Sequence, residues 1–467
     1  MRYISTRGEA PAVSFTDALL IGLARDGGLY VPETWPRLSA ATIAAFAGKP
    51  YAEVAVEVIA PFVGGTIADA DLAKMASEAY AVFDDPAVAP LRQLRPGEYL
   101  LELFHGPTLA FKDVAMQLIA RLMDHVLAER GERATVVAAT SGDTGGAAVE
   151  AFRDRARIDA VVLFPHGRIS DVQRRMMTTV PDKNIHAVAI QGTFDDCQAI
   201  VKGLFGDAGF RARVKLSAVN SINWARIASQ AVYYFTAAAA LGAPPKLSFV
   251  VPTGNFGDIF AGYVAKKMGL SFARLVIAAN VNDILPRALA SGRYEVRKVI
   301  ATASPAMDIQ VSSNFERLLF DVYGRDAAAI RKLMGELAAR GSFQIAPGAL
   351  AAMRETFDAA SADEAETRET IRAVDRASGY LLDPHSAVGL AVARRQKIAP
   401  PVVALATAHA AKFPDAIKAA TGKEPALPPH FADLSRRPER LTVLPADQAA
   451  VARFVVEHSR VAEKAVP

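Results

Sequence analysis

The amino-acid sequence predicts an α/β protein whose sheets are doubly wound and mostly parallel, with helices on both faces. Short apolar, β-branched runs recur from about residue 98 onward, and longer amphipathic stretches separate them. This alternation favours parallel sheets, because each parallel pair of strands needs a crossover connection. The preceding segment of about 90 residues instead reads as mainly helical. The predicted strands are Thr135–Ala139, Ala160–Phe164, His186–Ile190, Leu247–Val251, Leu275–Ala279 and Val402–Ala406.

The chain length of 467 residues predicts two to four domains, since a domain typically holds roughly 100–200 residues. We expect a mainly helical domain over residues 1–92 and two α/β domains over residues 93–245 and 246–467, which exchange segments. Predicted helices include Val114–Glu129, Asp258–Met268, a solvated helix Asp358–Val374 and an amphipathic helix from Ala446 to about Lys464.

Composition and charge exclude several classes of protein. A hydrophobic content of 51% with 22% charged residues excludes a disordered chain, a collagen and a pure coiled coil. The 53 basic and 49 acidic residues are interspersed, so no nucleic-acid partner is expected. The single cysteine, Cys197, excludes an intramolecular disulfide and a Cys-rich zinc site. The N-terminus has no secretory signal, and the apolar stretch Ile227–Pro245 predicts a buried helix too short for a bilayer. We therefore expect a cytoplasmic protein without a membrane partner.

The first of three strand–loop–helix junctions is LSFVVPTGNFGD, from Leu247 to Asp258. A loop containing glycines lets the backbone approach a ligand, and the following helix N-terminus offers unpaired N–H groups, which together favour a phosphate. The pattern matches neither GxxxxGK[ST] nor GxGxxG, so nucleotide binding is disfavoured. An ordinary βα turn in which Asp258 caps the helix remains an alternative.

The second junction is ATVVAATSGDTGG, from Ala134 to Gly146. Four polar side chains occur within five residues of a strand end. A helix cap needs only one of them, whereas hydroxyls and backbone N–H groups together could hold a carboxylate. These side chains are Thr140, Ser141, Asp143 and Thr144.

The third junction, FHGPTLAFKDVAMQ from Phe104 to Gln117, places Lys112 at the start of a helix. The helix dipole disfavours a cation there, so the amine could be neutral and able to form an imine. A solvated surface lysine is the alternative. His385 and His409 lie in segments that could reach a cleft, although each alone is more often structural. No HExxH or G-x-S-x-G motif occurs, which disfavours a zincin and an α/β-hydrolase.

Taken together, these segments resemble the threonine synthase family of fold-type II pyridoxal 5′-phosphate (PLP) enzymes, over nearly the whole chain. The resemblance implies two doubly wound, mostly parallel sheets. Ala410 is a small departure, since many relatives carry proline there. The segments that carry the resemblance are RYISTRGEAPAVSFTDALLIGLARDGGLYVP, FHGPTLAFKD, ATSGDTGGAA, PTGNFGD, SPAMDIQVSSNFERLLF, GYLLDPHSAVG and LATAHAAKFPDAI.

The resemblance also implies roles for individual residues. Lys112 would bind PLP covalently and shuttle a proton, and the hydroxyl of Thr407 would meet the pyridine nitrogen. Asn223 and Arg226 are candidates for the substrate phosphate. The backbone that cradles the cofactor phosphate would be that of Gly254, Asn255, Phe256, Gly257 and Asp258. The residues that would hold the substrate carboxylate are Ser141, Gly142, Asp143 and Thr144.

The implied reaction converts O-phospho-L-homoserine and water to L-threonine and phosphate. Two alternatives stay open at this stage. A PLP-dependent serine/threonine dehydratase would share the lysine and the glycine loop but would bind no substrate phosphate. A non-catalytic relative would only bind PLP or a phosphorylated metabolite. The sequence leaves open whether the protein is a monomer or a homodimer.

Overall fold

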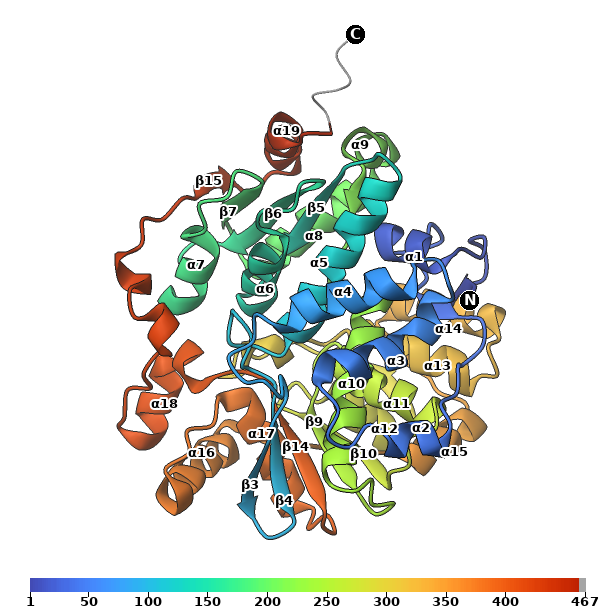
Figure 1. The fold of residues 1–467 in the computed structure, drawn as a ribbon, viewed down its shortest axis with the longest axis vertical. Helices are drawn as coiled ribbons and strands as arrows, with labels where there is room; N and C mark the ends of the chain where they lie inside the picture. Colours follow the sequence, from blue (N-terminus) through green and yellow to red (C-terminus); the bar gives the residue numbers. More distant parts are fainter. Residues whose placement is uncertain (462–467) are drawn as a thin grey trace.

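Two separate sheets organise the computed structural model, which describes residues 1–461 (Figure 1). The first is a five-stranded, wholly parallel sheet of order β15-β7-β6-β5-β8. Its last strand comes from near the C-terminus, so in Figure 1 the red β15 lies beside the green β7. The strands are β5 (Ala134–Ala139), β6 (Ile158–Pro165), β7 (Ile185–Gln191), β8 (Leu216–Ser217) and β15 (Thr442–Pro445).

The second sheet has six strands in the order β13-β10-β9-β14-β4-β3, and only its β3–β4 hairpin is antiparallel. β4 comes from residues 98–102, ahead of the first sheet in the chain, and β15 returns to the first sheet. Each of the two predicted α/β domains therefore contributes a strand to the sheet of the other. The domain boundaries themselves stay a prediction. The strands are β3 (Leu91–Arg95), β4 (Glu98–Glu102), β9 (Ser248–Pro252), β10 (Arg274–Ala279), β13 (Phe357–Ser361) and β14 (Val402–Ala406).

All six predicted strands form, each within two residues of its predicted bounds. These strands could be predicted from their continuous apolar sequence because helices cover both faces of the sheets. Every residue of β6, for example, is buried. The mainly parallel arrangement of strands and helices is therefore confirmed.

One solvated helix over Asp358–Val374 was the wrong expectation for that segment. Its first residues belong to β13, the edge strand that pairs with β10, and Asp358 is bound by Arg274 at 2.6 Å. The helix α16 begins only at Glu364, after a capping box formed by Asp363 and Glu366. The extended conformation depends on a partner strand some 80 residues away along the chain, which local pattern does not reveal.

The C-terminal amphipathic helix is shorter than the predicted span from Ala446 to Lys464. It runs as α19 from Gln448 to His458, with Asp447 accepting a hydrogen bond from the third helical N–H. The last three residues of the predicted span, 462–464, lie outside the described residues.

The N-terminal segment packs across the region between the two sheets (Figure 1). Its helix α3 (Tyr51–Val63) packs on the buried α10 (Trp224–Ala240), and α4 (Asp69–Tyr80) packs on α5 (Lys112–Glu129). The Trp224 ring lies 5.5–6.0 Å from the aromatic rings of Tyr3, Trp35 and Phe62. This segment is mainly helical as predicted, with one short antiparallel pair, β1 (Tyr3–Ser5) and β2 (Tyr30–Pro32).

The remaining helices surround the two sheets. No helix within residues 1–461 is long and apolar enough to cross a membrane. The short strands β11 (Arg293–Glu295) and β12 (Ser342–Gln344) form a separate antiparallel pair. The helices are α1 (Phe15–Ile21), α2 (Ala40–Ala44), α6 (Asp143–Phe152), α7 (Asp171–Thr178), α8 (Phe194–Gly206), α9 (Ala208–Val214), α11 (Gly257–Lys267), α12 (Ile284–Ser291), α13 (Phe315–Val322), α14 (Ala327–Arg340), α15 (Pro347–Thr356), α16 (Glu364–Ser378), α17 (Pro384–Arg395) and α18 (Pro414–Thr421).

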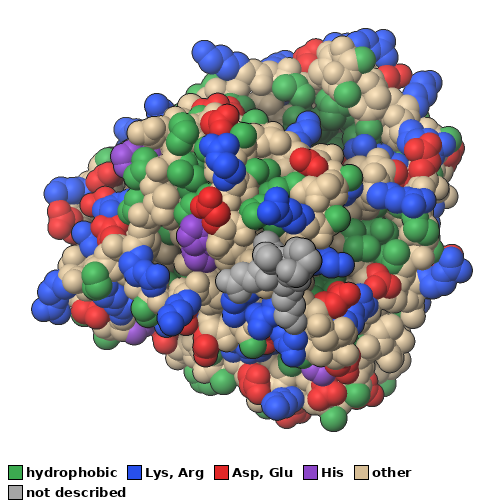
Figure 2. Space-filling model, turned by 90° about the horizontal axis from the view of Figure 1, so that it is seen from above, with side chains coloured by type: hydrophobic (Ala, Val, Ile, Leu, Met, Phe, Trp, Pro, Cys, Tyr) green, Lys and Arg blue, Asp and Glu red, His purple; other side chains and the backbone are tan. Residues whose placement is uncertain are grey.

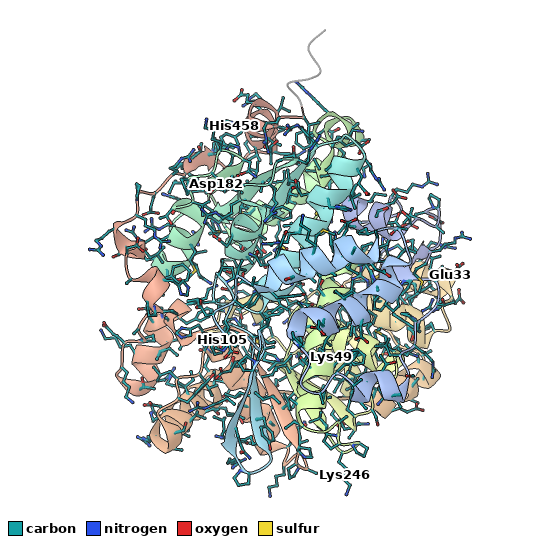
Figure 3. The ribbon with its side chains drawn as sticks, viewed as in Figure 1. Glu33, Lys49, His105, Asp182, Lys246 and His458 are labelled. Carbon is teal, nitrogen blue, oxygen red and sulfur yellow. The ribbon has the colours of Figure 1, made fainter. Side chains whose placement is uncertain are left out.

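The surface carries both signs of charge side by side. In Figure 2, Lys and Arg side chains are interspersed with Asp and Glu over the face shown. Figure 3 marks the two ends of the molecule: His458 lies on α19 at one end, and Lys246, just before β9, lies at the other. Lys246 is exposed.

Candidate active site

A cavity of about 390 Å³ lies where the carboxyl ends of β5, β9 and β14 meet the N-termini of α5, α6 and α11. Ligands of open α/β sheets bind at this edge. The cavity brings together ten of the thirteen predicted site residues, which come from four distant segments and from α10. Those lining it are Lys112, Ser141, Thr144, Arg226, Gly254, Asn255, Phe256, Gly257, Asp258 and Thr407.

Lys112, the first residue of α5, is buried and not the solvated surface lysine of the alternative reading. Its Nζ lies 3.2 Å from Oδ2 of Asp143, whose Oδ1 lies 2.8 Å from Nζ of Lys412. Burial lowers the pKa of Lys112, the Asp143 charge opposes this, and the charges of Lys412 and Arg226 lower it further. The net direction is a lowered pKa, which makes the neutral, nucleophilic form of the amine easier to reach.

The side chain of Asp143 is itself held as an anion. Burial alone would raise its pKa, but the neighbouring Lys112, Lys412 and His385 side chains hold that pKa well below its usual range. Gln173 also donates to it, at 3.0 Å. Because two anions repel each other, the Asp143 side chain is not suited to hold a substrate carboxylate. Asp143 can contribute only its backbone N–H.

The rest of that loop keeps the geometry of an anion site. Ser141 and Thr144 line the cavity, and the first N–H groups of α6 have no intrahelical partner. Gly142 adopts φ +137°, and a Cβ there would lie 2.5 Å from the Gln173 side chain. Gly142 therefore shapes the loop without lining the cavity.

The glycine loop before α11 presents backbone N–H groups in the same way. Phe256, at φ +65°, precedes the helix and makes no side-chain cap. A Cβ on Gly254 would lie 2.7 Å from the carbonyl oxygen of Ala306, so only glycine fits there. Within residues 1–461, the N–H groups of Gly257 and Asp258 donate no hydrogen bond. They are free for an anion.

Asp258 is not the helix cap of the alternative reading, since it is the second residue of α11. Its Oδ1 accepts hydrogen bonds from the hydroxyls of Tyr233 and Tyr234, at 2.5 and 3.0 Å. Its Oδ2 is buried without a partner in the described chain. Burial raises its pKa to about 6 even though the two tyrosines, Lys112 and Arg226 lower it.

Arg226 supplies a buried cation to the cavity. Its Nη1 donates to the carbonyl of Val219 at 3.4 Å, and its Nε has no partner among the described residues. Burial lowers its pKa to about 10, where it is still charged at neutral pH. A phosphate matches a guanidinium with free donors.

Asn223 does not reach the cavity. Its amide nitrogen donates to the carbonyls of Leu19 and Ala218, at 2.9 and 3.0 Å, and its Oδ1 accepts from the N–H of Ala225 as the cap of α10. The side chain is fully buried and its hydrogen bonds are taken. This corrects the expectation of a phosphate ligand at Asn223.

Thr407 directly follows β14 and lines the cavity. Its N–H donates to Oγ of Ser386 at 2.9 Å, and its carbonyl accepts from the N–H of Phe111 at 2.9 Å. The second bond ties Thr407 to the residue before Lys112. Thr407 and Lys112 therefore line the same cavity from neighbouring backbone segments.

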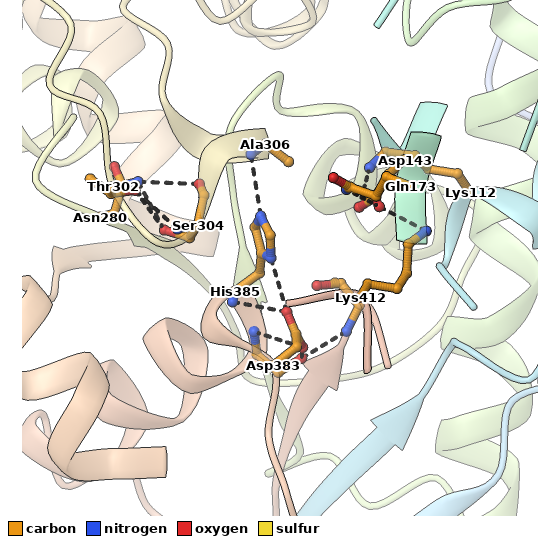
Figure 4. A network of polar contacts seen from close by, with 12 residues as sticks. Lys112, Asp143, Gln173, Asn280, Thr302, Ser304, Ala306, Asp383, His385 and Lys412 are labelled. Atoms are coloured by element: carbon orange, nitrogen blue, oxygen red, sulfur yellow. Dashed lines mark hydrogen bonds and ion pairs between the residues drawn. The ribbon is translucent and has the colours of Figure 1, made fainter. Parts of the chain in front are cut away.

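His385 also lines the cavity, which its motif alone left undecided. Its Nδ1 lies 2.9 Å from Oδ1 of Asp383, and its Nε2 accepts from the N–H of Ala306 at 3.2 Å (Figure 4). The proton therefore resides on Nδ1. His409 instead accepts from the N–H of Ala411 at 3.2 Å and stays structural.

Three family models match the chain in succession: "Threonine synthase N terminus" over residues 2–80, "Pyridoxal-phosphate dependent enzyme" over residues 86–353, and "Threonine synthase, C-terminal" over residues 386–455. A threonine synthase of Pseudomonas aeruginosa is 54% identical, covering 98% of each chain. The chain belongs to the threonine synthase family.

Solved structures of that family agree. The PLP-bound threonine synthase of Brucella melitensis superposes with a TM-score of 0.96 at 59% identity, covering 98% of this chain and all of the other. Yeast threonine synthase superposes with a TM-score of 0.92 at 39% identity, covering 99% of each. The predicted fold type II and the PLP cofactor are therefore confirmed.

The cavity of this threonine synthase family member fits PLP on its own geometry. It holds a buried lysine with a lowered pKa, the free N–H groups of a helix N-terminus and an arginine whose Nε has no partner among the described residues. Motif reading left His385 undecided and missed the other partners that tune these groups: Lys412 and the hydroxyls of Tyr233 and Tyr234. The adjacent tyrosines Tyr233-Tyr234, in a helix that the sequence predicts to be buried, are the signal that could have indicated a buried acceptor.

Proposed function

We propose that this chain converts O-phospho-L-homoserine and water to L-threonine and phosphate, the last step of threonine biosynthesis. The observation that carries the proposal is the joint presence, in one cavity, of buried Lys112 and two separate anion sites. These are the N-terminus of α11 and the Arg226 guanidinium. A cofactor phosphate and a substrate phosphate each require such a site, whereas a dehydratase substrate brings no phosphate.

PLP, when bound, would serve as the electron sink that makes the protons on the substrate carbons removable. The loop Gly254–Asp258 would hold its phosphate through backbone N–H groups, and Lys112 would hold it covalently through Nζ. The neutral hydroxyl of Thr407 would face the ring nitrogen, which leaves that nitrogen free of the negative charge a carboxylate would bring.

The substrate would be held at both ends. Ser141, Thr144 and the free N–H groups of α6 would bind its carboxylate, and Arg226 would bind its phosphate. Nζ of Lys112, once released from covalent attachment, would accept the Cα proton and move it along the substrate. A second proton would then leave Cβ as phosphate departs from Cγ. A proton returned to Cγ would complete the methyl group, the hydroxyl of water would add at Cβ, and a proton returned to Cα would complete L-threonine.

We further propose a cytoplasmic location. Cys197, the single cysteine, is buried and free, and burial raises its pKa to about 12, so the protein needs no oxidising compartment. Whether the chain acts as a monomer or a homodimer stays a prediction.

Phosphate release from O-phospho-L-homoserine, with analysis of the amino-acid product, tests the function. We expect equal amounts of phosphate and threonine. Ammonia and a 2-oxo acid formed from serine or threonine, without phosphate release, would show a dehydratase, and PLP binding without turnover would show a silent relative.

A second measurement tests the role of Lys112. Borohydride reduction and peptide mapping should place PLP on Lys112, and Lys112→Ala should abolish turnover while the fold persists. PLP fixed on another lysine would contradict the assignment.

A further inference from the structure

A second buried lysine lies behind Lys112 and has no role in the reaction so far described. Lys412 is 1% exposed. Its Nζ lies 2.8 Å from Oδ1 of Asp143 and donates to the carbonyl of Thr108 at 2.7 Å. Figure 4 shows Lys112 and Lys412 approaching Asp143 from different elements. Lys412 does not line the cavity that contains Lys112, so it is placed to act on Lys112 through the shared carboxylate and through its own charge.

Lys112, Asp143 and Lys412 together carry a net positive charge if both lysines are protonated. Two ammonium groups would then share a single carboxylate in a buried setting, where an uncompensated charge is costly. If one lysine is neutral, the other lysine and Asp143 form a single ion pair whose charges cancel. Other ionisable groups face it: Arg226 and Asp258 face Lys112, Asp113 and His409 face Lys412, and His385 faces Asp143.

The hydrogen bonds distinguish the two amines. Lys412 has two close acceptors, the Asp143 carboxylate and the Thr108 carbonyl, and both are held by the fold. Lys112 has one, at the longer distance of 3.2 Å, and its amine faces the cavity. The pKa of Lys112 is lowered first by burial, and the Lys412 charge adds to that effect. Lys112 is therefore the amine that gives up its proton.

We propose that Lys412 is a positioning residue for Lys112: it acts as the standing counterion of Asp143, so that Lys112 can leave that carboxylate as a neutral amine. The inference rests on the proposed role of Lys112 as the cofactor lysine. Without Lys412, Asp143 would keep Lys112 as its sole counterion and hold it protonated. Covalent attachment of PLP would then need a higher pH.

The test is the pH profile of PLP attachment to the cofactor-free protein, read as the borohydride-fixed mass gain on the peptide that contains Lys112. For Lys412→Met we expect the profile to move up by about one pH unit, which is about a tenfold slower attachment at pH 7.5. Lys412→Arg keeps the positive charge and should restore the wild-type profile. Lys246→Met, at the exposed far end of the molecule, is the matched control and should leave it unchanged.

A second variant covers the case in which Lys412→Met does not fold. Asp143→Asn removes the shared carboxylate, so the profile should move to lower pH, opposite to Lys412→Met. A profile that stays in place in either folded variant, or a rate that falls equally at every pH, overturns the inference. In that case wild-type attachment at Lys112 would still support the proposed function, whereas no attachment at Lys112 in the wild type would refute both.

Discussion

Replacing Asp258 by Asn should stabilise the cofactor-free protein at neutral pH and not at acid pH. The Asp258 carboxylate is buried, receives both its hydrogen bonds at Oδ1, and leaves Oδ2 without a partner in the described structure. Asparagine keeps an acceptor for Tyr233 and Tyr234 and carries no charge. The substitution therefore removes a buried charge and retains the hydrogen bonds.

The size of the effect follows from the pKa of Asp258, which burial raises from 3.8 to about 6. The pKa of Asp258 is higher in the folded than in the unfolded protein. The protonated carboxyl therefore contributes its full stability below about pH 4, and that contribution is lost as the pH rises through 6. A shift of about two units corresponds to about 3 kcal/mol. At about 2.1 cal/mol/K per residue, the unfolding entropy of a chain this long makes that about 3 °C in Tm.

Thermal unfolding of the cofactor-free wild type and Asp258→Asn at pH 4.5 and pH 7.5 measures this difference. The variant should gain about 2 °C at pH 7.5 relative to its gap at pH 4.5, because pH 4.5 lies above the unfolded-state pKa and about a third of the effect is already present there. Asp321→Asn is the matched control of opposite sign. Although burial raises the pKa of Asp321, hydrogen bonds from Tyr263 and Trp35 and the Lys267 charge lower it overall, so that variant should lose stability as the pH rises. An equal gap for Asp258→Asn at both pH values would refute the reasoning.

Three further substitutions separate structural from binding roles. Asn223→Ala removes the α10 cap and leaves two carbonyls unpaired, so the free energy of unfolding should fall by about 1–3 kcal/mol; denaturant unfolding checks this, and a raised KM for O-phospho-L-homoserine would return Asn223 to the substrate site. Gly142→Ala combines a positive φ with an added Cβ only 2.5 Å from the Gln173 side chain, so it should lower the free energy of unfolding by about 1–3 kcal/mol in the same assay. An unchanged denaturation midpoint would show that the loop adapts to the substitution. At Gly257 an added Cβ meets no atom closer than 3.4 Å, so Gly257→Val should keep the Tm of the cofactor-free protein yet weaken PLP binding at least about tenfold in titration, or else the phosphate binds elsewhere.

The sequence alone determined the features that depend on local pattern. The six runs that predicted strands are largely buried on both faces, so their apolar, β-branched composition was enough to predict them as strands. The first two strand–loop–helix junctions could also be predicted as anion sites from sequence, because the free N–H groups of a helix N-terminus are a property of the local backbone. Lys112, Arg226, Thr407 and the glycine loop, which stand out by their motifs, accordingly line one cavity of the folded chain.

Only the tertiary structure decided which polar groups are paired. Asp143 and Asn223 look like ligands in sequence. In the structure, however, Asp143 forms ion pairs with Lys112 and Lys412, and Asn223 donates a hydrogen bond to a carbonyl 204 residues away. Lys412 in turn contacts a carbonyl 304 residues away. The strand β13 likewise exists because β10 lies beside it. Side-chain partners and edge pairing are set by contacts between distant segments, and spacing along the chain records only which side of its own helix or strand a residue occupies.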